Sequence, residues 1–245
     1  MDLKLQGKVA LVTGAGSQTG FGRAICLSLA EEGCDIAAVD IDLEGAEMTA
    51  SAVRQLGRRA LAVFVDVRDQ DSVNSMVEQV LDHFKKIDIL VNNAGASSPQ
   101  KPFSEKPKEE WDFDISVNLY GQMNVIKAVV PHMISRRYGR IINFTGGQGI
   151  PGLSTYGAAK AAIVAFSKAL AKELAPYGIF VNVVAPGLSK TGLTKDATQE
   201  FIDRYLQSSA IKRLCTPADV APVVTFLASD LCSYITGQVI RISAT

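Results

Sequence analysis

The sequence predicts an α/β fold in which one doubly wound parallel sheet of seven strands carries helices on both faces. Short apolar runs alternate with helical stretches along nearly all of the 245 residues, and this alternation is typical of parallel sheets. The first apolar run, residues 8–13, ends in a glycine-rich turn that leads straight into a helical stretch. No linker, repeat or low-complexity segment interrupts the pattern, so we expect one domain over residues 1–245.

The expected elements follow one another in regular order. Apolar residues, valine above all, dominate seven runs that we expect to be buried strands: residues 8–13, 35–40, 60–65, 87–91, 140–145, 179–184 and 237–242. Periodicity predicts helices over residues 23–30, 43–56, 71–84, 109–136, 155–176 and from Thr216 onward, with a kink at Pro131. We expect two longer connections between these elements. One is a Pro/Ser loop at 96–108, and the other is a mobile stretch at about 188–207.

Composition excludes several function classes. The 25 basic and 25 acidic residues cancel, and no long block of one sign occurs, which argues against nucleic acid or an anionic membrane as the partner. No apolar run reaches the ~18 residues of a membrane span, and no signal-peptide pattern opens the chain. The four cysteines lack CxxC spacing and lie far from the two histidines. We therefore expect reduced cysteines, no metal site and a cytoplasmic protein.

The glycine-rich turn and the acid that follows it predict a dinucleotide site. Gly14, Gly16, Gly20 and Gly22 lie between the first strand and the first helix, where backbone N–H groups can approach a pyrophosphate. Asp40 ends the second expected strand, where a carboxylate can accept hydrogen bonds from both ribose hydroxyls and repel a 2′-phosphate. We therefore expect NAD rather than NADP. The alternative is that Asp40 caps the next helix, although Asp42 is the better cap candidate.

Tyr156 and Lys160 form the candidate catalytic pair. They are four residues apart in a stretch that is predicted to be helical, so a phenol and an ammonium project from one face. A nearby cation favours the phenolate and lowers the phenol pKa from its usual ~10. The pair is a plausible general acid/base for a proton on an alcohol oxygen. The alternative is an ordinary pair on a helix surface.

The chain resembles the short-chain dehydrogenase/reductase family over nearly its whole length. The motifs that carry the resemblance occur in the family's order: TGAGSQTGFG at 13–22, Asp40, DV at 66–67, NNAG at 92–95, Asn118 in SVNLYG, YGAAK at 156–160, PGLSKT at 186–191 and TGQVIRI near the end. As an ordered set they are highly specific. The resemblance implies a Rossmann fold that binds a nicotinamide dinucleotide.

The same resemblance implies roles for individual residues. Tyr156 would be the acid/base, Lys160 would lower its pKa and hold the nicotinamide ribose, and Asn118 would anchor a proton-relaying water chain. Cofactor contacts would come from Gly14, Gly20, Phe21 and Gly22 at the pyrophosphate, Asp66 and Val67 at the adenine, Asn92, Ala94 and Gly95 near the ribose, and Pro186, Gly187 and Thr191 near the nicotinamide. Relatives pack long helices and the last strand across two-fold interfaces, so we expect a homotetramer or a homodimer.

Two departures from the family pattern stand out. Gly14 and Gly20 are separated by five residues, where the family usually has three, so the turn is longer. The family places a serine about thirteen residues before the tyrosine, to steady the charge on the substrate oxygen, but Asn143 occupies that position. If the loop is about three residues short, the serine aligns near Gly146, and Thr145 offers the hydroxyl. Gln148 and Ser154 remain alternatives, and Thr145 can equally be an ordinary strand residue.

These observations favour an NAD-dependent oxidoreductase that moves a hydride between the cofactor and a secondary alcohol or ketone. One alternative is an NADPH-dependent 3-oxoacyl-thioester reductase, which would have to tolerate a 2′-phosphate beside Asp40. An alternative from another class is a weakly catalytic dinucleotide-binding sensor or scaffold, suggested by the missing serine. We expect residues near 96–98, 146–153 and 188–207 to contact the small-molecule substrate, because loops carry specificity on a shared fold.

Overall fold

The seven strands form one parallel sheet in the order β3-β2-β1-β4-β5-β6-β7. The computed structural model describes residues 2–189 and 198–244. The strands are β1 (Val9–Thr13), β2 (Asp35–Asp40), β3 (Ala60–Phe64), β4 (Ile89–Asn92), β5 (Gly139–Phe144), β6 (Ile179–Pro186) and β7 (Val239–Ile242), and every neighbouring pair is parallel. The strand order reverses between β1 and β4, and open α/β sheets bind ligands at such a point, beyond the carboxyl ends of the strands.

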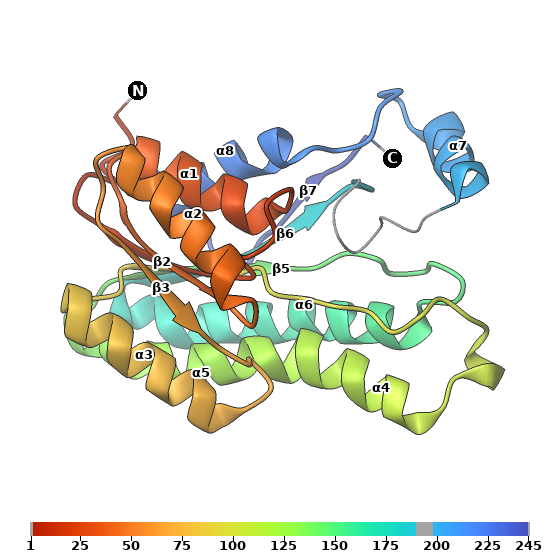
Figure 1. The fold of residues 1–245 in the computed structure, drawn as a ribbon, viewed down its shortest axis with the longest axis horizontal. Helices are drawn as coiled ribbons and strands as arrows, with labels where there is room; N and C mark the ends of the chain where they lie inside the picture. Colours follow the sequence, from red (N-terminus) through yellow and green to blue (C-terminus); the bar gives the residue numbers. More distant parts are fainter. Residues whose placement is uncertain (1, 190–197, 245) are drawn as a thin grey trace.

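Helices cover both faces of the sheet (Figure 1). One face carries α1 (Phe21–Glu31), α2 (Leu43–Gln55) and α8 (Pro217–Ala228), and the other carries α3 (Gln70–Phe84), α5 (Gly121–Arg136) and α6 (Ser154–Leu174). Each face has its own apolar core. The strands are apolar throughout because both of their faces are covered, as in β1, where all five residues are buried. The predicted fold class is confirmed.

The long helix that the sequence predicts over residues 109–136 is not uniform. It consists of α4 (Lys108–Ile115), a π-helical turn (Ser116–Tyr120) and α5. Asn118 lies within the π turn, and its Nδ2 donates to the carbonyl of Asp114 at 2.8 Å. A side chain that bonds to the backbone in this way competes with the regular helical ladder. The helix continues past Pro131, which lies inside α5.

The stretch expected to be mobile contains a helix, α7 (Gln199–Ser208). Thr198 caps it by accepting a hydrogen bond from the N–H of Phe201, and Arg204 pairs with Glu200 one turn away at 2.8 Å. Phe201, Ile202, Tyr205 and Leu206 recur with a helical period in this segment, so the sequence did carry a signal for the helix. Ser189, at the other end of the stretch, forms an isolated bridge with Cys215. Residues 190–197 lie outside the described residues.

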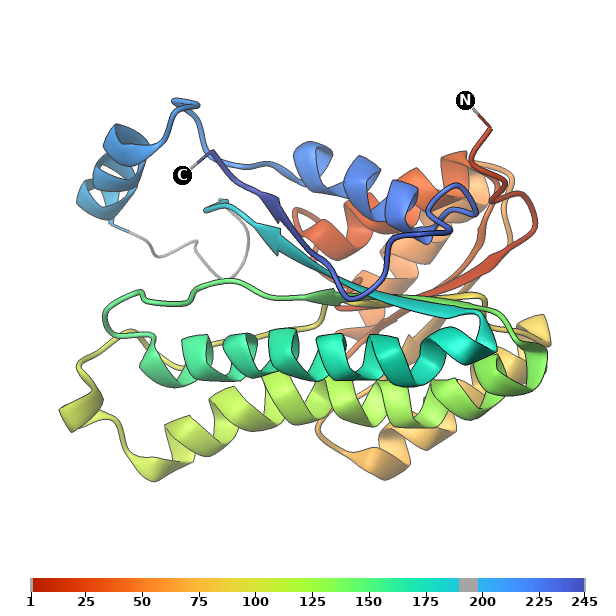
Figure 2. The same ribbon diagram turned by 180° about the vertical axis from the view of Figure 1, so that it is seen from behind.

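Loops from distant parts of the chain meet at the carboxyl ends of the strands. The loops after β4 and β5, the start of α4, the first turn of α6 and helix α7 all lie at this end of the molecule (Figures 1 and 2). The candidate site residues that follow β1 to β6 are thereby brought to one edge of the sheet. Within the described part of the chain, no helix is long and apolar enough to span a membrane.

Candidate active site

The glycine turn after β1 packs closely against the start of α1. A Cβ on Gly22 would lie 2.1 Å from the carbonyl oxygen of Gly14, so no other residue fits there. Gly20 is the N-cap of α1 and offers no side-chain oxygen to the first N–H groups of the helix. Those N–H groups, and the positive end of the helix dipole, suit an anionic group such as a pyrophosphate.

Two residues that the sequence reasoning missed hold this turn in place. The hydroxyl of Thr13 accepts hydrogen bonds from the N–H groups of Asn93 and Ala94, at 3.1 and 3.0 Å. The amide of Asn93 donates to the carbonyls of Thr13 and Gly14, both at 3.0 Å. These bonds join the ends of β1 and β4 at the switch point. Thr13 and Asn93 both lie inside motifs that the sequence shows, TGAGSQTGFG and NNAG. Their hydrogen bonds to each other's segments become visible only in the folded structure.

Asp40 reaches the glycine turn. Its carboxylate accepts hydrogen bonds from the N–H of Gly16 at 2.7 Å and from the N–H of Asp42 at 2.9 Å. Asp42 caps α2 by accepting from the N–H of Gly45 at 3.0 Å, so the helix-capping alternative for Asp40 is wrong. Gln18, one of the extra residues in the turn, donates to the carbonyls of Gly16 and Gly45. The longer turn is therefore fastened to both β2 and α2.

Asp66 is engaged by an arginine. Its two carboxylate oxygens accept hydrogen bonds from the guanidinium of Arg68, the shortest at 2.6 Å. These bonds lower the pKa of Asp66 below its usual value. Val67 next to it is buried and packs against Gly121 at the start of α5. Both residues follow β3, where the resemblance expects the adenine.

The side chain of Asn92 lies between β4 and β5. Its side chain is buried and donates to Oδ1 of Asn143 on β5 at 2.9 Å. Asn143 in turn donates to Ser167 on α6 at 2.9 Å. The chain of amides ties β4 and β5 to α6. Of the NNAG motif, Asn93 and Ala94 contact the end of β1, and Gly95 lies against Asn118 and Lys160.

Tyr156, Lys160 and Asn118 lie together at the carboxyl ends of β4 and β5. Nζ of Lys160 is 5.8 Å from the ring centre of Tyr156. A Cβ on Gly95 would lie 2.9 Å from Oδ1 of Asn118 and 3.1 Å from Nζ of Lys160, so these two polar atoms flank the same small space. Among the described residues, Oδ1 of Asn118 is buried without a hydrogen-bond partner. Nζ of Lys160 donates a long hydrogen bond of 3.4 Å to the carbonyl of Phe144.

The two ionisable groups of this cluster are shifted in ways that favour their neutral forms. Burial, and secondarily the carboxylate of Asp114, raises the pKa of Tyr156 to about 12. Burial lowers the pKa of Lys160 to about 8. In the polypeptide by itself, burial therefore sets the direction of the tyrosine pKa shift, which is opposite to the lowering expected from a neighbouring cation. The tyrosine holds its proton firmly at neutral pH.

The hydroxyl of Thr145 is already used within the protein. It donates to the carbonyl of Lys160 at 2.6 Å and accepts from the amide of Gln148 at 2.7 Å. A hydroxyl has one proton to give, so Thr145 has none left for a substrate oxygen in this arrangement. Gln148 is exposed and has a second amide hydrogen, and Ser154 is exposed at the start of α6.

The end of β6 lies beside α7. Pro186 is the last residue of β6, and the N–H of Gly187 donates to the carbonyl of Ile242 at 2.8 Å. The phenol of Tyr205 on α7 accepts from the N–H of Leu188 at 3.3 Å and lies within 2.9 Å of a Cβ placed on Gly187. The helix α7 is thus attached to the strand end expected near the nicotinamide. Thr191 lies outside the described residues.

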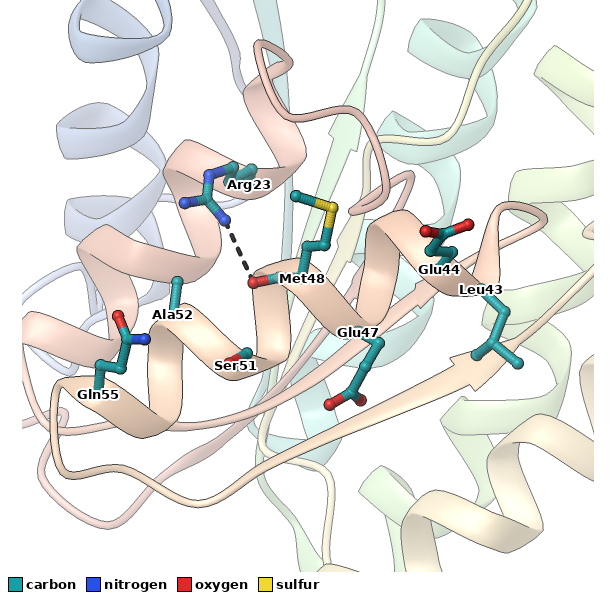
Figure 3. Close-up of a pocket in the computed structure, with 8 residues that line it drawn as sticks. All are labelled: Arg23, Leu43, Glu44, Glu47, Met48, Ser51, Ala52 and Gln55. Atoms are coloured by element: carbon teal, nitrogen blue, oxygen red, sulfur yellow. Dashed lines mark hydrogen bonds between the residues drawn. The ribbon is translucent and has the colours of Figure 1, made fainter.

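A separate hollow of about 670 Å³ opens between α1 and α2 (Figure 3). The guanidinium of Arg23 on α1 donates a hydrogen bond to the carbonyl of Met48 on α2 at 3.5 Å, and Glu44 and Glu47 are among the other residues that line the hollow. None of the residues assembled above lines it, so it is a surface feature distinct from the candidate site. Among the residues that the structure describes, no group of three His, Cys, Asp or Glu side chains could hold a metal.

Known proteins match this chain from end to end. The family profile described as Enoyl-(Acyl carrier protein) reductase matches residues 14–244. The 3-oxoacyl-(acyl-carrier-protein) reductase FabG of Thermotoga maritima is 40% identical over 243 residues, which cover 98% of this chain and 98% of that protein.

Solved structures agree with this match. NAD⁺-bound xylitol dehydrogenase is similar with a TM-score of 0.92 and 34% identity, over 99% of this chain and 100% of that one. The 7α-hydroxysteroid dehydrogenase complexed with NADH and 7-oxo glycochenodeoxycholic acid is similar with a TM-score of 0.94 and 30% identity, over 99% and 95%. With the ordered motifs and the parallel sheet already established, the chain belongs to the short-chain dehydrogenase/reductase family of oxidoreductases.

Proposed function

We propose that this oxidoreductase interconverts a ketone and a secondary alcohol with NAD(H) as cofactor, and that Tyr156 is its general acid/base. The observation that carries the proposal is that Nζ of Lys160 lies 5.8 Å from the ring centre of Tyr156 and, together with Oδ1 of Asn118, flanks the small space at Gly95. A bound nicotinamide dinucleotide supplies the hydride acceptor or donor. The residues of the chain have to bind the substrate, orient it and move the proton.

The tyrosine serves as the proton donor when a ketone is reduced. Because its pKa is about 12, its phenol is protonated at neutral pH and can donate to the carbonyl oxygen as charge develops there. The buried ammonium of Lys160, with a pKa of about 8, can return a proton to the phenolate. Oδ1 of Asn118, which lacks a hydrogen-bond partner among the described residues, can accept a hydrogen bond from a relaying water. This arrangement favours reduction at neutral pH and oxidation at alkaline pH.

The residues at the turn after β1 fit the cofactor. The uncapped start of α1 suits the pyrophosphate, and the carboxylate of Asp40 lies at the turn, where it can accept from ribose hydroxyls and repel a 2′-phosphate. We propose NAD(H) over NADP(H) on this ground. Lys160 would also hold the nicotinamide ribose, and Gly187 with Pro186 would lie near the nicotinamide.

For the substrate, we favour a 3-oxoacyl thioester within the ketone class. Relatives named 3-oxoacyl-(acyl-carrier-protein) reductase match this chain at 38–41% identity over nearly its full length. This match supports a 3-oxoacyl thioester as the substrate over a simple secondary alcohol. The reduction itself uses the same proton path. A weakly catalytic sensor or scaffold remains the opposing hypothesis, and the complete set of Tyr156, Lys160 and Asn118 argues against it, because a sensor needs no proton path.

The proposal is tested by following dinucleotide absorbance with a panel of substrates. A 3-oxoacyl thioester, a simple cyclic ketone and a secondary alcohol are each assayed with NADH or NAD⁺ and with their phosphorylated counterparts. We expect the thioester to be reduced fastest, and kcat/KM to be higher with NADH than with NADPH. Failure of every substrate with either cofactor, while NADH still binds, would support the sensor hypothesis. A clear preference for NADPH would overturn the proposed role of Asp40.

We propose in addition that the chain acts as a homotetramer in a reducing cytoplasm. Exposed apolar side chains occur on two separate surfaces, with Tyr120 on the outer side of the π turn and Phe226, Leu231 and Tyr234 near α8 and β7. Such surfaces are typical of subunit contacts. All four cysteines are free, which agrees with a reducing compartment.

A further inference from the structure

A buried cluster of charged and hydroxyl side chains lies next to Tyr156 and has no place in the proton path described above. Its centre is Asp114 on α4, whose side chain is fully buried. The carboxylate accepts hydrogen bonds from the N–H and the hydroxyl of Ser98, at 2.7 and 2.9 Å. It also accepts from the hydroxyl of Thr155, at 2.5 Å. Thr155 immediately precedes Tyr156 in the first turn of α6.

A buried lysine completes the cluster. The side chain of Lys106 is fully buried, and its Nζ donates to the hydroxyl of Ser98 at 2.6 Å and to the carbonyl of Pro99 at 3.0 Å. Nζ is 4.0 Å from Asp114 and 3.7 Å from Glu110. Burying charges in this way is costly unless each is paired and hydrogen-bonded. Asp114 and Lys106 meet that condition, and their hydrogen bonds fasten the loop at 96–108 to α4.

The backbone of Asp114 contributes a second link. Its carbonyl accepts from the amide of Asn118 at 2.8 Å, while the same amide donates to the carbonyl of Ala96 at 2.5 Å. Asp114 therefore contacts the loop expected to face the substrate, the residue before Tyr156, and Asn118. We propose that Asp114 is a positioning residue for the catalytic tyrosine: it holds the first turn of α6 and the loop at 96–108 against each other. This inference rests on the proposed function.

The charge of Asp114 has a second consequence. The charged groups that face Tyr156 are Lys160 on its own helix and Asp114 from α4, with Lys106 and Glu110 behind Asp114; residues 145–153 carry no titratable side chain. A negative charge near a phenol opposes its ionisation. Removing that charge should lower the pKa of Tyr156, whereas removing only the hydrogen bond to Thr155 should not.

Two variants separate the hydrogen bond from the charge. In Asp114→Asn the side chain keeps its shape and can still bond to Thr155 and Ser98, but the charge is gone. In Thr155→Val the hydroxyl is gone and the charge stays. We expect Asp114→Asn to move the alkaline limb of the pH profile of alcohol oxidation to lower pH by at least about 0.5 unit, in the direction of losing a like charge. We expect Thr155→Val to lower kcat roughly 10-fold, as for a misplaced catalytic group, with the pH midpoint unchanged.

Asp88→Asn is the matched control, because Asp88 is a buried, ion-paired carboxylate that lies at the start of β4 and pairs with Arg136. It should leave the pH midpoint unchanged. A profile for Asp114→Asn that superimposes on that of the wild type or of Asp88→Asn would overturn the proposal. If Asp114→Asn does not fold, Thr155→Val decides, and a kcat within about twofold of the wild type would overturn the inference.

A readout that needs no turnover keeps this test separate from the test of the proposed function. The ionisation of Tyr156 is followed by ultraviolet difference absorbance, with Tyr156→Phe as the blank. We expect the midpoint in Asp114→Asn to lie below that of the wild type. Should the wild-type chain reduce no ketone, the proposed function fails, and the titration still supports or overturns the electrostatic coupling between Asp114 and Tyr156.

Discussion

Lys160 is buried and Tyr156 is half-buried, and loss of solvent works against the charged form of each. Their spacing could be predicted from the sequence because residues four apart share a helix face. The direction of their pKa shifts could not, because desolvation depends on which distant segments cover them. Asp114 illustrates the same limit: an acid in a helical stretch gives no sign that it will meet Ser98 and Thr155.

Thr145 and Gln148 offer a prediction at the scale of single residues. The hydroxyl of Thr145 donates to the carbonyl of Lys160 and accepts from the amide of Gln148. We therefore expect the amide of Gln148 to donate the hydrogen bond that stabilises charge on the substrate oxygen. Gln148→Ala should lower kcat/KM roughly 10²-fold, as for other donors of this kind. Thr145→Val should cost a similar amount because Gln148 loses its partner, and Thr145→Ser should retain most activity.

The double variant Thr145→Val/Gln148→Ala distinguishes this account from the earlier assignment to Thr145. If both residues act through one amide, the double variant is no slower than either single variant. If Thr145 itself contacts the substrate, the losses in kcat/KM multiply, and Thr145→Val alone is slower than Gln148→Ala.

At the scale of elements, the strands and most helices could be predicted because each is long enough to show its apolar period. The elements that the sequence did not predict are mainly those whose conformation depends on particular contacts. The residue types of the π turn at Ser116–Tyr120 also occur in regular helices, so the sequence does not reveal it. Its distinguishing feature is the hydrogen bond from the side chain of Asn118 to the carbonyl of Asp114. Helix α7 is the exception, since its apolar residues Phe201, Ile202, Tyr205 and Leu206 do show a helical period.

Asp88 gives a prediction for how β1 and β4 are held together. Its carboxylate is buried and accepts from the N–H of Val9 at 2.9 Å and from Arg136 at 2.8 Å. Although burial opposes its charge, these bonds and Lys86 lower the pKa of Asp88. We expect Asp88→Asn to reduce the free energy of unfolding at pH 7 by about 3 kcal/mol, because it leaves the two cations without their buried partner.

The pH dependence follows from the sign of that shift. A carboxylate whose pKa is lowered by folding stabilises the protein above its unfolded pKa of ~3.9 and loses this effect as the pH falls through its folded pKa. The difference between wild type and Asp88→Asn in urea unfolding should therefore shrink between pH 7 and about pH 3. The exposed Glu78→Gln is the control and should change stability by less than about 0.5 kcal/mol. An equal difference at both pH values would contradict this account.

At the scale of the whole molecule, the sheet order brings residues from six loops to one edge (Figure 1). This arrangement could be predicted, because parallel strands joined by helices place all their carboxyl ends together. Substrate choice could not, since it belongs to side chains on loops that the periodic pattern does not fix.

Assembly is a prediction of this scale. The separate apolar surfaces around Tyr120 and Tyr234 should each bury against a copy of the chain. Sedimentation equilibrium should give a mass four times that of the 26.2 kDa chain, and Tyr234→Asp should reduce it to a dimer, because a buried charge without a partner disfavours an interface. A monomer at micromolar concentration would contradict the expectation.

The central claim is that the phenol of Tyr156 carries the proton while the rest of the site binds the cofactor. The most direct measurement compares wild type and Tyr156→Phe, with NADH binding followed by fluorescence and ketone reduction followed by absorbance. We predict that kcat falls roughly 10²- to 10⁴-fold, the range of general acid/base catalysis, while the Kd for NADH changes by less than about twofold. A Tyr156→Phe variant that reduces the ketone at close to the wild-type rate would contradict the account.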